Sequence, residues 1–326
     1  MRVLITGGYG CVGSWVIRRL FDRGVRAVWV YDIAYQPARL QLLLSPEELA
    51  QVQHVSGDVT DLDALVGALR EHRITHVLHL AALQVPFCQA DPLAGARVNV
   101  VGTVTVFEAV RRVWPAIGQV VYASSVAVYG PPEAYDQQPV PETVPLLPTT
   151  LYGGYKVCNE LNARVYWQDH GIASVGLRPW AIYGVGRDQG LTSGPTKAIK
   201  AVVAGRRYRI GYGGWQALQY AEDVAELFVQ FLHRRLESAA VYNLRGSVVS
   251  MEEFVRALAR VDRRAEELIS YEPTQLAIAY DLDDRALCTV LPEFSYTPLE
   301  EGIRRTYERF RALHEQGRLS LEDLER

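Results

Sequence analysis

Short apolar runs alternate with amphipathic stretches along the first two-thirds of the chain. Residues 3–6 form an apolar run that leads into glycines, and residues 11–22 follow with one apolar face at helical spacing. The same patterns predict further strands at 27–31, 52–55, 75–80, 120–123 and 174–177, and helices at 61–70, 92–113 and 150–169. Because strands buried on both faces and separated by helices form parallel sheets, we expect an α/β fold with a doubly wound parallel sheet.

The pattern loosens after about residue 180. Glycines and a proline interrupt residues 184–195, after which short strands at 207–210 and 241–244 alternate with helices at 222–232, 252–260 and 301–313. We expect a main domain over residues 1–180, with strand and helix contributions from about 205–235. Residues 181–316 then form mainly a smaller C-terminal lobe, and the polar residues 317–326 form a peripheral tail.

Composition and charge narrow the class of protein. Of 326 residues 49% are hydrophobic and the net charge is −3, so a large core is expected and no charge excess favours nucleic acid or an anionic membrane. The four cysteines are far apart in sequence, which argues against a metal site and a disulfide framework. The N-terminus runs straight into a predicted strand instead of a signal peptide, and no apolar run is long enough to span a bilayer. We therefore expect a cytoplasmic protein without a bound metal.

Three glycines mark a candidate dinucleotide site. Gly7, Gly10 and Gly13 follow the first strand and open the first helix. In such a motif one glycine makes the turn, one leaves room for a pyrophosphate and one lets helix and strand pack closely, while the helix N-terminus attracts phosphate. The alternative is an ordinary glycine-rich turn. The position at the start of a parallel sheet favours the nucleotide site of a Rossmann-type fold.

Acidic residues at strand ends extend this prediction. Asp32 closes the second strand, about 20 residues beyond the glycines, where a carboxylate binds a ribose 2′-hydroxyl and repels a 2′-phosphate. NAD is therefore favoured over NADP, although Arg39 nearby could oppose that preference. Asp58 follows the third strand, and it either receives the adenine amino group or caps a helix.

The helix at 150–169 carries candidate acid/base chemistry. A spacing of four puts Tyr152 and Lys156 on one face of it, whereas Tyr155 points elsewhere. A phenol titrates near ~10, and an ammonium together with a positive nicotinamide ring is expected to lower that pKa. The tyrosine can then exchange a hydroxyl proton while a hydride moves to or from NAD.

Polar side chains elsewhere fit the same chemistry. Ser124 and Ser125 follow the strand at 120–123, where a hydroxyl bridges a substrate oxygen and the tyrosine or only satisfies the local backbone. Asn99 lies in the helix at 92–113, and its amide bonds a main-chain group, takes part in a proton relay through water, or is structural.

Taken in order, these motifs resemble the extended branch of the short-chain dehydrogenase/reductase superfamily, the NAD-dependent epimerase/dehydratase group. The resemblance covers nearly the whole chain. The matching stretches are Thr6-Gly7-x-x-Gly10-x-x-Gly13, Gly57-Asp58-Val59, His79-Leu80-Ala81-Ala82, Asn99-Val100-x-Gly102-Thr103, Ser124-Ser125-x-x-Val128-Tyr129-Gly130, Tyr152-x-x-x-Lys156, Leu177-Arg178-Pro179-x-x-Ile182-Tyr183-Gly184, Glu222-Asp223-Val224-Ala225 and Thr297-Pro298-Leu299.

The resemblance implies roles for individual residues. Ser125 is the catalytic hydroxyl, Tyr152 the acid/base and Lys156 its partner. The C-terminal lobe binds the substrate, and the chain forms a homodimer through the helices near 92–113 and 150–169. The residues implied to bind NAD are Gly7, Gly10, Cys11, Val12, Gly13, Asp32, Asp58, Val59, Leu80, Ala81, Ala82, Asn99, Tyr152, Lys156 and Pro179.

The chain departs from the family's pattern where the substrate is selected. Dehydratases of the family carry an Asp-Glu pair where this chain has Val126 and Ala127, so dehydration is disfavoured. Decarboxylation is disfavoured as well, because the family's decarboxylases also use an acidic residue in this stretch. The residues that usually hold a UDP-sugar are missing at Ala181, in the loop 190–195 and in 215–220. In the last segment there is no arginine to bind a diphosphate. These departures favour a smaller carbohydrate-like substrate: a free sugar, uronate, sugar acid or polyol. The residues expected near it are Gln84, Ser125, Val126, Trp180, Thr192 and Ser193.

Three functions stay open at this point. An epimerase, which reduces and reoxidises NAD within one turnover, and a net dehydrogenase would use the same catalytic residues. The intact stretch from Ser124 to Gly130 favours the epimerase, whereas the missing nucleotide contacts favour a small-molecule dehydrogenase. The third function is a catalytically silent NAD-sensing protein, and the complete set of catalytic residues argues against it.

Overall fold

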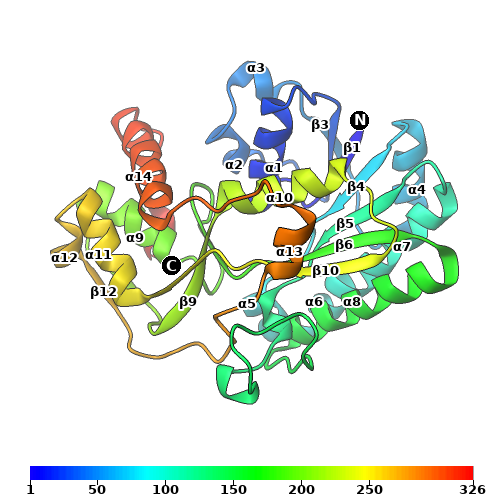
Figure 1. Cartoon of the computed structure of the whole chain (residues 1–326). Helices are drawn as coiled ribbons and strands as arrows, with labels where there is room; N and C mark the ends of the chain where they lie inside the picture. The colour runs from blue at the N-terminus through cyan, green and yellow to red at the C-terminus, as the bar shows by residue number, and fades with distance from the viewer. Residues whose placement is uncertain (326) are drawn as a thin grey trace.

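Seven parallel strands form the main sheet in the computed structural model of the chain, which describes residues 1–325 (Figure 1). Their order is β10-β6-β5-β4-β1-β2-β3, so the winding reverses between β1 and β4, where such sheets bind ligands. The expected α/β class and doubly wound sheet are confirmed. The strands are β1 (Val3–Thr6), β2 (Val28–Asp32), β3 (Gln53–Ser56), β4 (His76–His79), β5 (Gln119–Ala123), β6 (Ala173–Arg178) and β10 (Ala239–Asn243).

Two hydrophobic layers cover the sheet. Successive residues of β1 face opposite layers: Ile5 belongs to one and Leu4 to the other. The helices α1 (Cys11–Asp22) and α10 (Ala221–His233) pack against each other in the first layer. The second layer contains α4 (Leu62–Glu71), α7 (Gly102–Val113) and α8 (Leu151–His170). Burial on both faces explains why the strands are continuous apolar runs in the sequence.

The helix predicted at 92–113 is interrupted by a π-helical turn. It consists of α6 (Pro92–Ala96), the π turn at Arg97–Val101 and α7. By length and composition alone the stretch Pro92–Val113 could cross a membrane, so the expectation that no run is long enough was wrong. Half of its apolar window is buried inside the protein, as in the core helix of a soluble protein, and a single such helix is weak evidence of a membrane span.

The C-terminal lobe is built on two small sheets. One has the order β11-β9-β7, and the other pairs β12 with β8. The sequence predicts that residues 205–235 contribute both a strand and a helix to the main domain. The strands in this segment, β8 and β9, pair inside the lobe, whereas its helix α10 packs on the main sheet. The strand that joins the main sheet from the C-terminal part of the chain is β10. The elements of the lobe are β7 (Ala181–Tyr183), α9 (Gly194–Val203), β8 (Tyr208–Ile210), β9 (Trp215–Tyr220), β11 (Ser247–Ser250), α11 (Met251–Val261), β12 (Ile269–Tyr271) and α14 (Leu299–Glu315).

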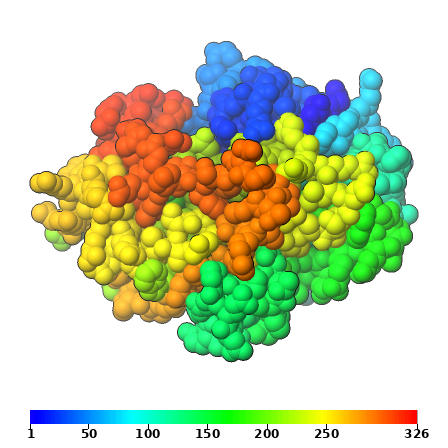
Figure 2. Space-filling model, viewed as in Figure 1, coloured from blue at the N-terminus to red at the C-terminus, as the bar shows by residue number. Residues whose placement is uncertain are grey.

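Polar contacts join the late segments to the rest of the molecule. The Asp223 carboxylate accepts bonds of 2.7 Å from both the backbone and the hydroxyl of Thr297, which connects the two late motifs. The Arg309 guanidinium donates to the Leu42 carbonyl, and in Figure 2 the red C-terminal helix lies beside the blue N-terminal segments. The remaining helices are α2 (Ala38–Gln41), α3 (Pro46–Leu49), α5 (Val85–Ala90), α12 (Ala265–Leu268) and α13 (Arg285–Val290), with 3-10 turns at Val126–Val128, Pro132–Ala134 and Glu322–Glu325.

Candidate active site

The predicted site residues gather at one edge of the main sheet. Parallel pairing places Thr6 opposite Tyr31 and His79, and His79 opposite Tyr122, so the carboxyl ends of β1, β2, β4 and β5 lie together. Ligands of doubly wound sheets bind at this edge. The loops that leave these strands carry the glycine motif, Asp32, residues 80–82 and the serine pair.

The glycine loop has the shape that a dinucleotide requires. Gly7 has a φ of +68°, and a Cβ on it would lie 2.7 Å from the backbone of Ala81. A Cβ on Gly13 would lie 2.6 Å from the Cα of Gly8, so α1 can approach the glycine loop this closely only because residue 13 is glycine. Gly10 is the N-cap of α1 and has no side chain to occupy the first N–H groups, which are available to a pyrophosphate. These residues fit NAD.

The loop after β4 is held against the glycine loop by a buried polar chain. The Thr6 hydroxyl accepts bonds from the backbone N–H groups of Leu80 and Ala81 and bonds Nδ1 of His79 at 2.7 Å. Nε2 of His79 bonds the Thr103 hydroxyl at 3.0 Å. Burial lowers the pKa of His79 to about 3, so the imidazole is neutral near pH 7 and acts as a bridge.

Asn99 lies in the π turn, buried behind the same loop. Its Oδ1 accepts from the Leu83 N–H at 2.7 Å, and its Nδ2 donates to the Leu83 carbonyl at 2.9 Å and to the Cys88 sulfur at 3.4 Å. The amide therefore holds the main chain of residue 83. Of the three alternatives for this residue, the structure favours the main-chain bond.

At the adenosine end, Asp32 and Asp58 occupy different environments. Asp32 ends β2, and burial raises the pKa of its carboxyl. Asp58 accepts bonds of 2.8 Å from the backbone and hydroxyl of Thr60, while Asp61 caps α4, so the helix-cap alternative for Asp58 was wrong. The cap lies three residues further on because α4 begins only at Leu62.

Arg39 does not compete with Asp32. Its guanidinium contacts both carboxylate oxygens of Asp188, with Nη2 2.7 Å from Oδ1, and donates to the Tyr9 carbonyl at 3.2 Å. A guanidinium already paired with a carboxylate attracts a 2′-phosphate less. This arrangement agrees with NAD as the cofactor.

A glycine brings the predicted catalytic residues together. Thr150 caps α8 by accepting from the Gly153 N–H at 3.0 Å. A Cβ on Gly153 would lie only 2.1 Å from the Ala127 carbonyl oxygen, so the first turn of α8 rests directly on the turn at Val126–Val128. Ser125 precedes that turn, and its hydroxyl accepts from the Ala127 N–H at 3.1 Å.

On α8, Tyr152 and Lys156 face the site and Tyr155 does not. Nζ of Lys156 donates to the Ala123 carbonyl at 2.7 Å and lies 5.5 Å from the centre of the Tyr152 ring. The Tyr155 hydroxyl donates to the Pro92 carbonyl at 2.9 Å. A spacing of four therefore places the first two side chains together, as the sequence predicts.

Burial dominates the titration of this pair. It raises the pKa of Tyr152 to about 12, while a hydrogen bond with Ser125 and the charge of Arg187 lower it. The expectation of a lowered pKa is therefore not met by the protein alone, because desolvation of the phenolate outweighs both effects. Burial also lowers the pKa of Lys156 to about 8. A bound, positively charged nicotinamide ring would lower the pKa of the phenol further.

A buried ion pair supports the site from behind. The Arg178 guanidinium lies 2.6 Å from the Glu160 carboxylate, with both side chains less than 10% exposed. The Ser124 hydroxyl donates to Glu160 at 2.5 Å, and Arg178 donates to the Tyr129 hydroxyl at 2.5 Å. Because the Ser124 hydroxyl is bound to Glu160, Ser125 stays the candidate of the two serines for a substrate contact.

The residues expected near the substrate fall into two groups. Thr192 lies in the loop after β7, where its hydroxyl accepts from Arg187 at 3.1 Å. Gln84 approaches Gly190 of the same loop. Ser193 is buried and donates to the Gly190 carbonyl.

Trp180 and Val126 are core residues. Trp180 is 6% exposed and its indole donates to the Ala279 carbonyl at 2.7 Å, so the prediction that it faces the substrate is not supported. Val126 is equally buried, and its N–H donates to the carbonyl of Pro179.

Sequence reasoning missed Arg187. The argument that no arginine could meet a diphosphate considered only the segment before Glu222, whereas the structure brings Arg187 in from the loop after β7. The one available signal was a charged residue inside a glycine-rich loop that follows Tyr183-Gly184.

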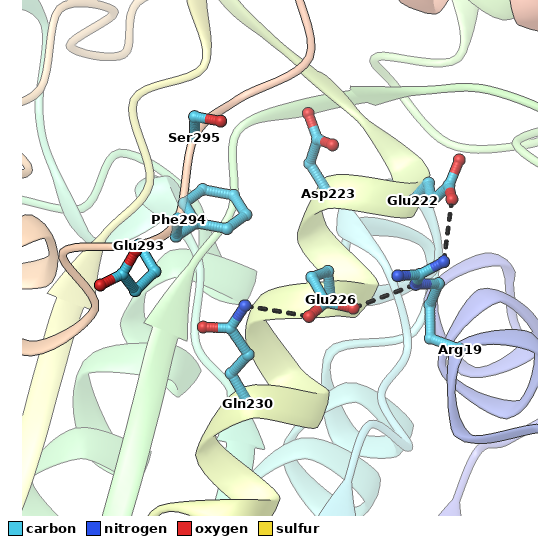
Figure 3. Close-up of a pocket in the computed structure, with 8 residues that line it drawn as sticks. All are labelled: Arg19, Glu222, Asp223, Glu226, Gln230, Glu293, Phe294 and Ser295. Carbon is cyan, nitrogen blue, oxygen red and sulfur yellow. Dashed lines mark hydrogen bonds and ion pairs between the residues drawn. The ribbon is translucent and has the colours of Figure 1, made fainter. Parts of the chain in front are cut away.

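A surface hollow elsewhere does not belong to this site. It lies between α1, α10 and residues 293–295 (Figure 3). Arg19 there pairs with Glu222 at 3.2 Å and with Glu226 at 3.0 Å. None of the residues predicted to bind NAD or substrate lines it.

Comparison with known proteins agrees with this geometry. A family model described as "NAD dependent epimerase/dehydratase family" matches residues 3–244. A UDP-glucose 4-epimerase of Mycolicibacterium smegmatis is 33% identical over 71% of this chain and 72% of its own length. The crystal structure of Thermus thermophilus UDP-glucose 4-epimerase with NAD is 28% identical, covers 95% of this chain and 99% of that one, and has a TM-score of 0.79. An L-threonine dehydrogenase from Clostridium difficile shares the fold at 19% identity, with a TM-score of 0.82 over 97% and 98% of the two chains.

Proposed function

The chain belongs to the NAD dependent epimerase/dehydratase family, and on this premise we propose that it is an NAD-dependent enzyme acting on a secondary alcohol or ketone of a sugar or sugar-like compound. The observation that carries the proposal is the approach of the first turn of α8 to the turn after Ser125. Together with the bond from Lys156 to the Ala123 carbonyl at the end of β5, this contact supports a catalytic set of Ser125, Tyr152 and Lys156.

Each of the three residues has a task in this proposal. When bound, NAD supplies the site that accepts or returns the hydride. The Ser125 hydroxyl positions the substrate oxygen, and Tyr152 takes or gives its proton. The Lys156 ammonium, with two N–H groups left after its bond to Ala123, stabilises the phenolate and can bond the ribose.

Epimerisation is the reaction that we place first. The relatives above 25% identity that are described in the preceding section are UDP-glucose 4-epimerases. Oxidation and re-reduction at one carbon need no residues beyond the three named. Val126 and Ala127 add no acid, which weighs against dehydration.

A net dehydrogenase is the second candidate. It is favoured by the absence of the usual UDP-sugar residues at Ala181 and in 215–220, which also leads us to propose a substrate without a nucleotide. Arg187 weakens the part of this argument that concerns a diphosphate. The substrate residues in either case are Gln84, Ser125, Thr192 and Ser193.

We extend the proposal to organisation and location. The substrate lobe covers mainly residues 181–316, next to the NAD-binding domain at 1–180. Exposed apolar side chains on the helices near 92–113 and 150–169 fit a homodimer; they are Leu93, Val101, Leu151, Leu161 and Val165. We expect the enzyme in the cytoplasm.

One experiment tests the proposal and separates the two reactions. Purified protein is incubated with NAD and a panel of free sugars, uronates, sugar acids, polyols and UDP-sugars. Reduced nicotinamide is followed by absorbance, and the same samples are analysed for isomerised sugar. A sustained rise identifies a dehydrogenase, and an isomer without a rise identifies an epimerase. The absence of both across the panel would refute a sugar-directed function.

A further inference from the structure

The loop after β7 holds an arginine without a carboxylate partner. Among residues 1–325, no Asp or Glu oxygen pairs with Arg187 within 4.0 Å. The carboxylate next to it in sequence, Asp188, is occupied by Arg39. Within residues 1–325, the one hydrogen bond found for Arg187 is to the Thr192 hydroxyl, at 3.1 Å, and its Nε is a buried atom without a partner. The side chain is partly buried, and a guanidinium with an unpaired, buried N–H is best satisfied by an anion.

Two more polar atoms near Arg187 are buried and unsatisfied. Gln84 and Arg187 converge on Gly190, since a Cβ there would lie 2.1 Å from Oε1 of Gln84 and 3.2 Å from Nη2 of Arg187. That Oε1 has no hydrogen-bond donor. The Tyr212 hydroxyl, on a side chain 3% exposed, also lacks a partner, and the charge of Arg187 acts on its pKa.

The unsatisfied atoms form a complementary pattern. Nε of Arg187 and the Tyr212 hydroxyl can donate to an anionic acceptor, whereas Oε1 of Gln84 needs a donor such as a hydroxyl. A planar guanidinium suits a carboxylate, which accepts two parallel bonds. A molecule that carries a carboxylate and neighbouring hydroxyls offers both the acceptors and the donor that these atoms lack.

The position of Arg187 connects this pattern to the reaction. Arg187 approaches Gly190 together with Gln84, which follows the loop after β4, so it lies at the edge of the sheet that carries the predicted catalytic residues. Its charge also lowers the pKa of Tyr152. An acid group on the molecule whose hydroxyl meets Tyr152 could bind at this edge. The charge of Arg187 is also felt by Cys11 at the start of α1, which makes the NAD pyrophosphate the competing occupant.

We propose that Arg187, with Gln84 and Thr192, is a carboxylate-binding site, and that the substrate is a sugar acid such as a uronate or an aldonate. The inference rests on the proposed function, because it places the acid on the molecule whose hydroxyl meets Tyr152. It adds a substrate class and a specificity residue that the family motifs do not contain.

Binding measurements test the site without requiring turnover. Calorimetry with wild type, saturated with reduced NAD, compares matched pairs: glucose with glucuronate, galactose with galacturonate, and glucose with gluconate. We expect at least one acid to bind about tenfold or more tightly than its neutral parent. Arg187→Gln should remove that preference, leave the neutral sugar unchanged and alter NAD affinity by less than about threefold. The control, Arg209→Gln, changes the same charge at an exposed pair with Glu272 and should behave as wild type.

Three results would overturn the site. Wild type could bind no acid more tightly than its neutral parent, or Arg187→Gln could weaken the binding of NAD as much as the binding of the acid. In the third, UDP-glucose would be the one ligand whose affinity depends on Arg187. The two proposals fail separately. Arg187-dependent acid binding without turnover of any compound would uphold the carboxylate site and refute the hydride-transfer function. Turnover of a neutral sugar, with no acid bound more tightly than its neutral parent, would do the reverse.

Discussion

Gly153 offers the sharpest mutational test of how the site is assembled. A Cβ at this position would lie 2.1 Å from the Ala127 carbonyl oxygen and 2.9 Å from Cβ of Pro148. In Gly153→Ala the first turn of α8 must therefore move away from the turn at Val126–Val128 by about 1 Å, a displacement that costs on the order of a hundredfold in rate when it separates reacting groups. The move separates Tyr152 from Ser125.

The neighbouring glycine is a matched control. A Cβ on Gly154 meets no atom within 4 Å. Gly154→Ala should raise the free energy of unfolding by up to about 1 kcal/mol, because alanine favours a helix interior over glycine. Gly153→Ala gains the same propensity, but overpacking costs about 1–3 kcal/mol, so its net effect is zero or destabilising.

Both variants are compared with wild type by urea unfolding and by initial rates on a compound that wild type converts. We expect a loss of about a hundredfold in kcat for Gly153→Ala and none for Gly154→Ala. Full activity in Gly153→Ala would refute the claim that this contact sets the distance between Ser125 and Tyr152. Equal losses in both variants would show that the helix, and not the contact, is responsible.

Three further predictions concern stability and cofactor choice. The pKa of His79 is about 3 in the folded protein and 6.5 in the unfolded chain, so only the unfolded state gains a proton at this residue as pH falls below 6.5. Between pH 7 and pH 5 this uptake lowers the free energy of unfolding by about 2 kcal/mol. Urea unfolding of His79→Gln should therefore show a pH dependence that is weaker by that amount. Arg178→Met leaves the Glu160 carboxylate buried and unpaired and should cost about 3–5 kcal/mol in urea unfolding, most of which a second change, Glu160→Leu, should restore. Asp32→Asn should weaken NAD binding about tenfold and improve NADP relative to NAD in fluorescence titration, since it removes the repulsion of a 2′-phosphate; an unchanged ratio would mean that Asp32 does not contact the ribose.

Local patterns predicted the parts of this site that lie within one element. Tyr152 and Lys156 could be paired from sequence because a helix repeats at near four residues, and both lie on α8. The glycine motif and Asp32 could be placed because the ends of successive parallel strands meet at one edge. These predictions need only the type of each element and the rule that orders them.

Contacts between distant elements were not predictable in the same way. Gly153 was an unremarkable helix residue until α8 was seen to rest on Ala127. Arg187 and Gln84 both approach Gly190, although their segments follow β7 and β4, which are far apart in the sequence. Trp180 follows β6 directly, yet its indole turns to Ala279 in the core. In each case the deciding partner is more than 20 positions away, and no local period encodes it.

The assignment of Tyr152 as the acid/base is decided by the turnover of Tyr152→Phe. Tyr155→Phe is the matched control, because that hydroxyl bonds Pro92 outside the site. We expect Tyr152→Phe to lower turnover by about a hundred- to ten-thousandfold, with NAD affinity within about twofold of wild type, and Tyr155→Phe to retain activity. Turnover by Tyr152→Phe within a few-fold of wild type would contradict the assignment.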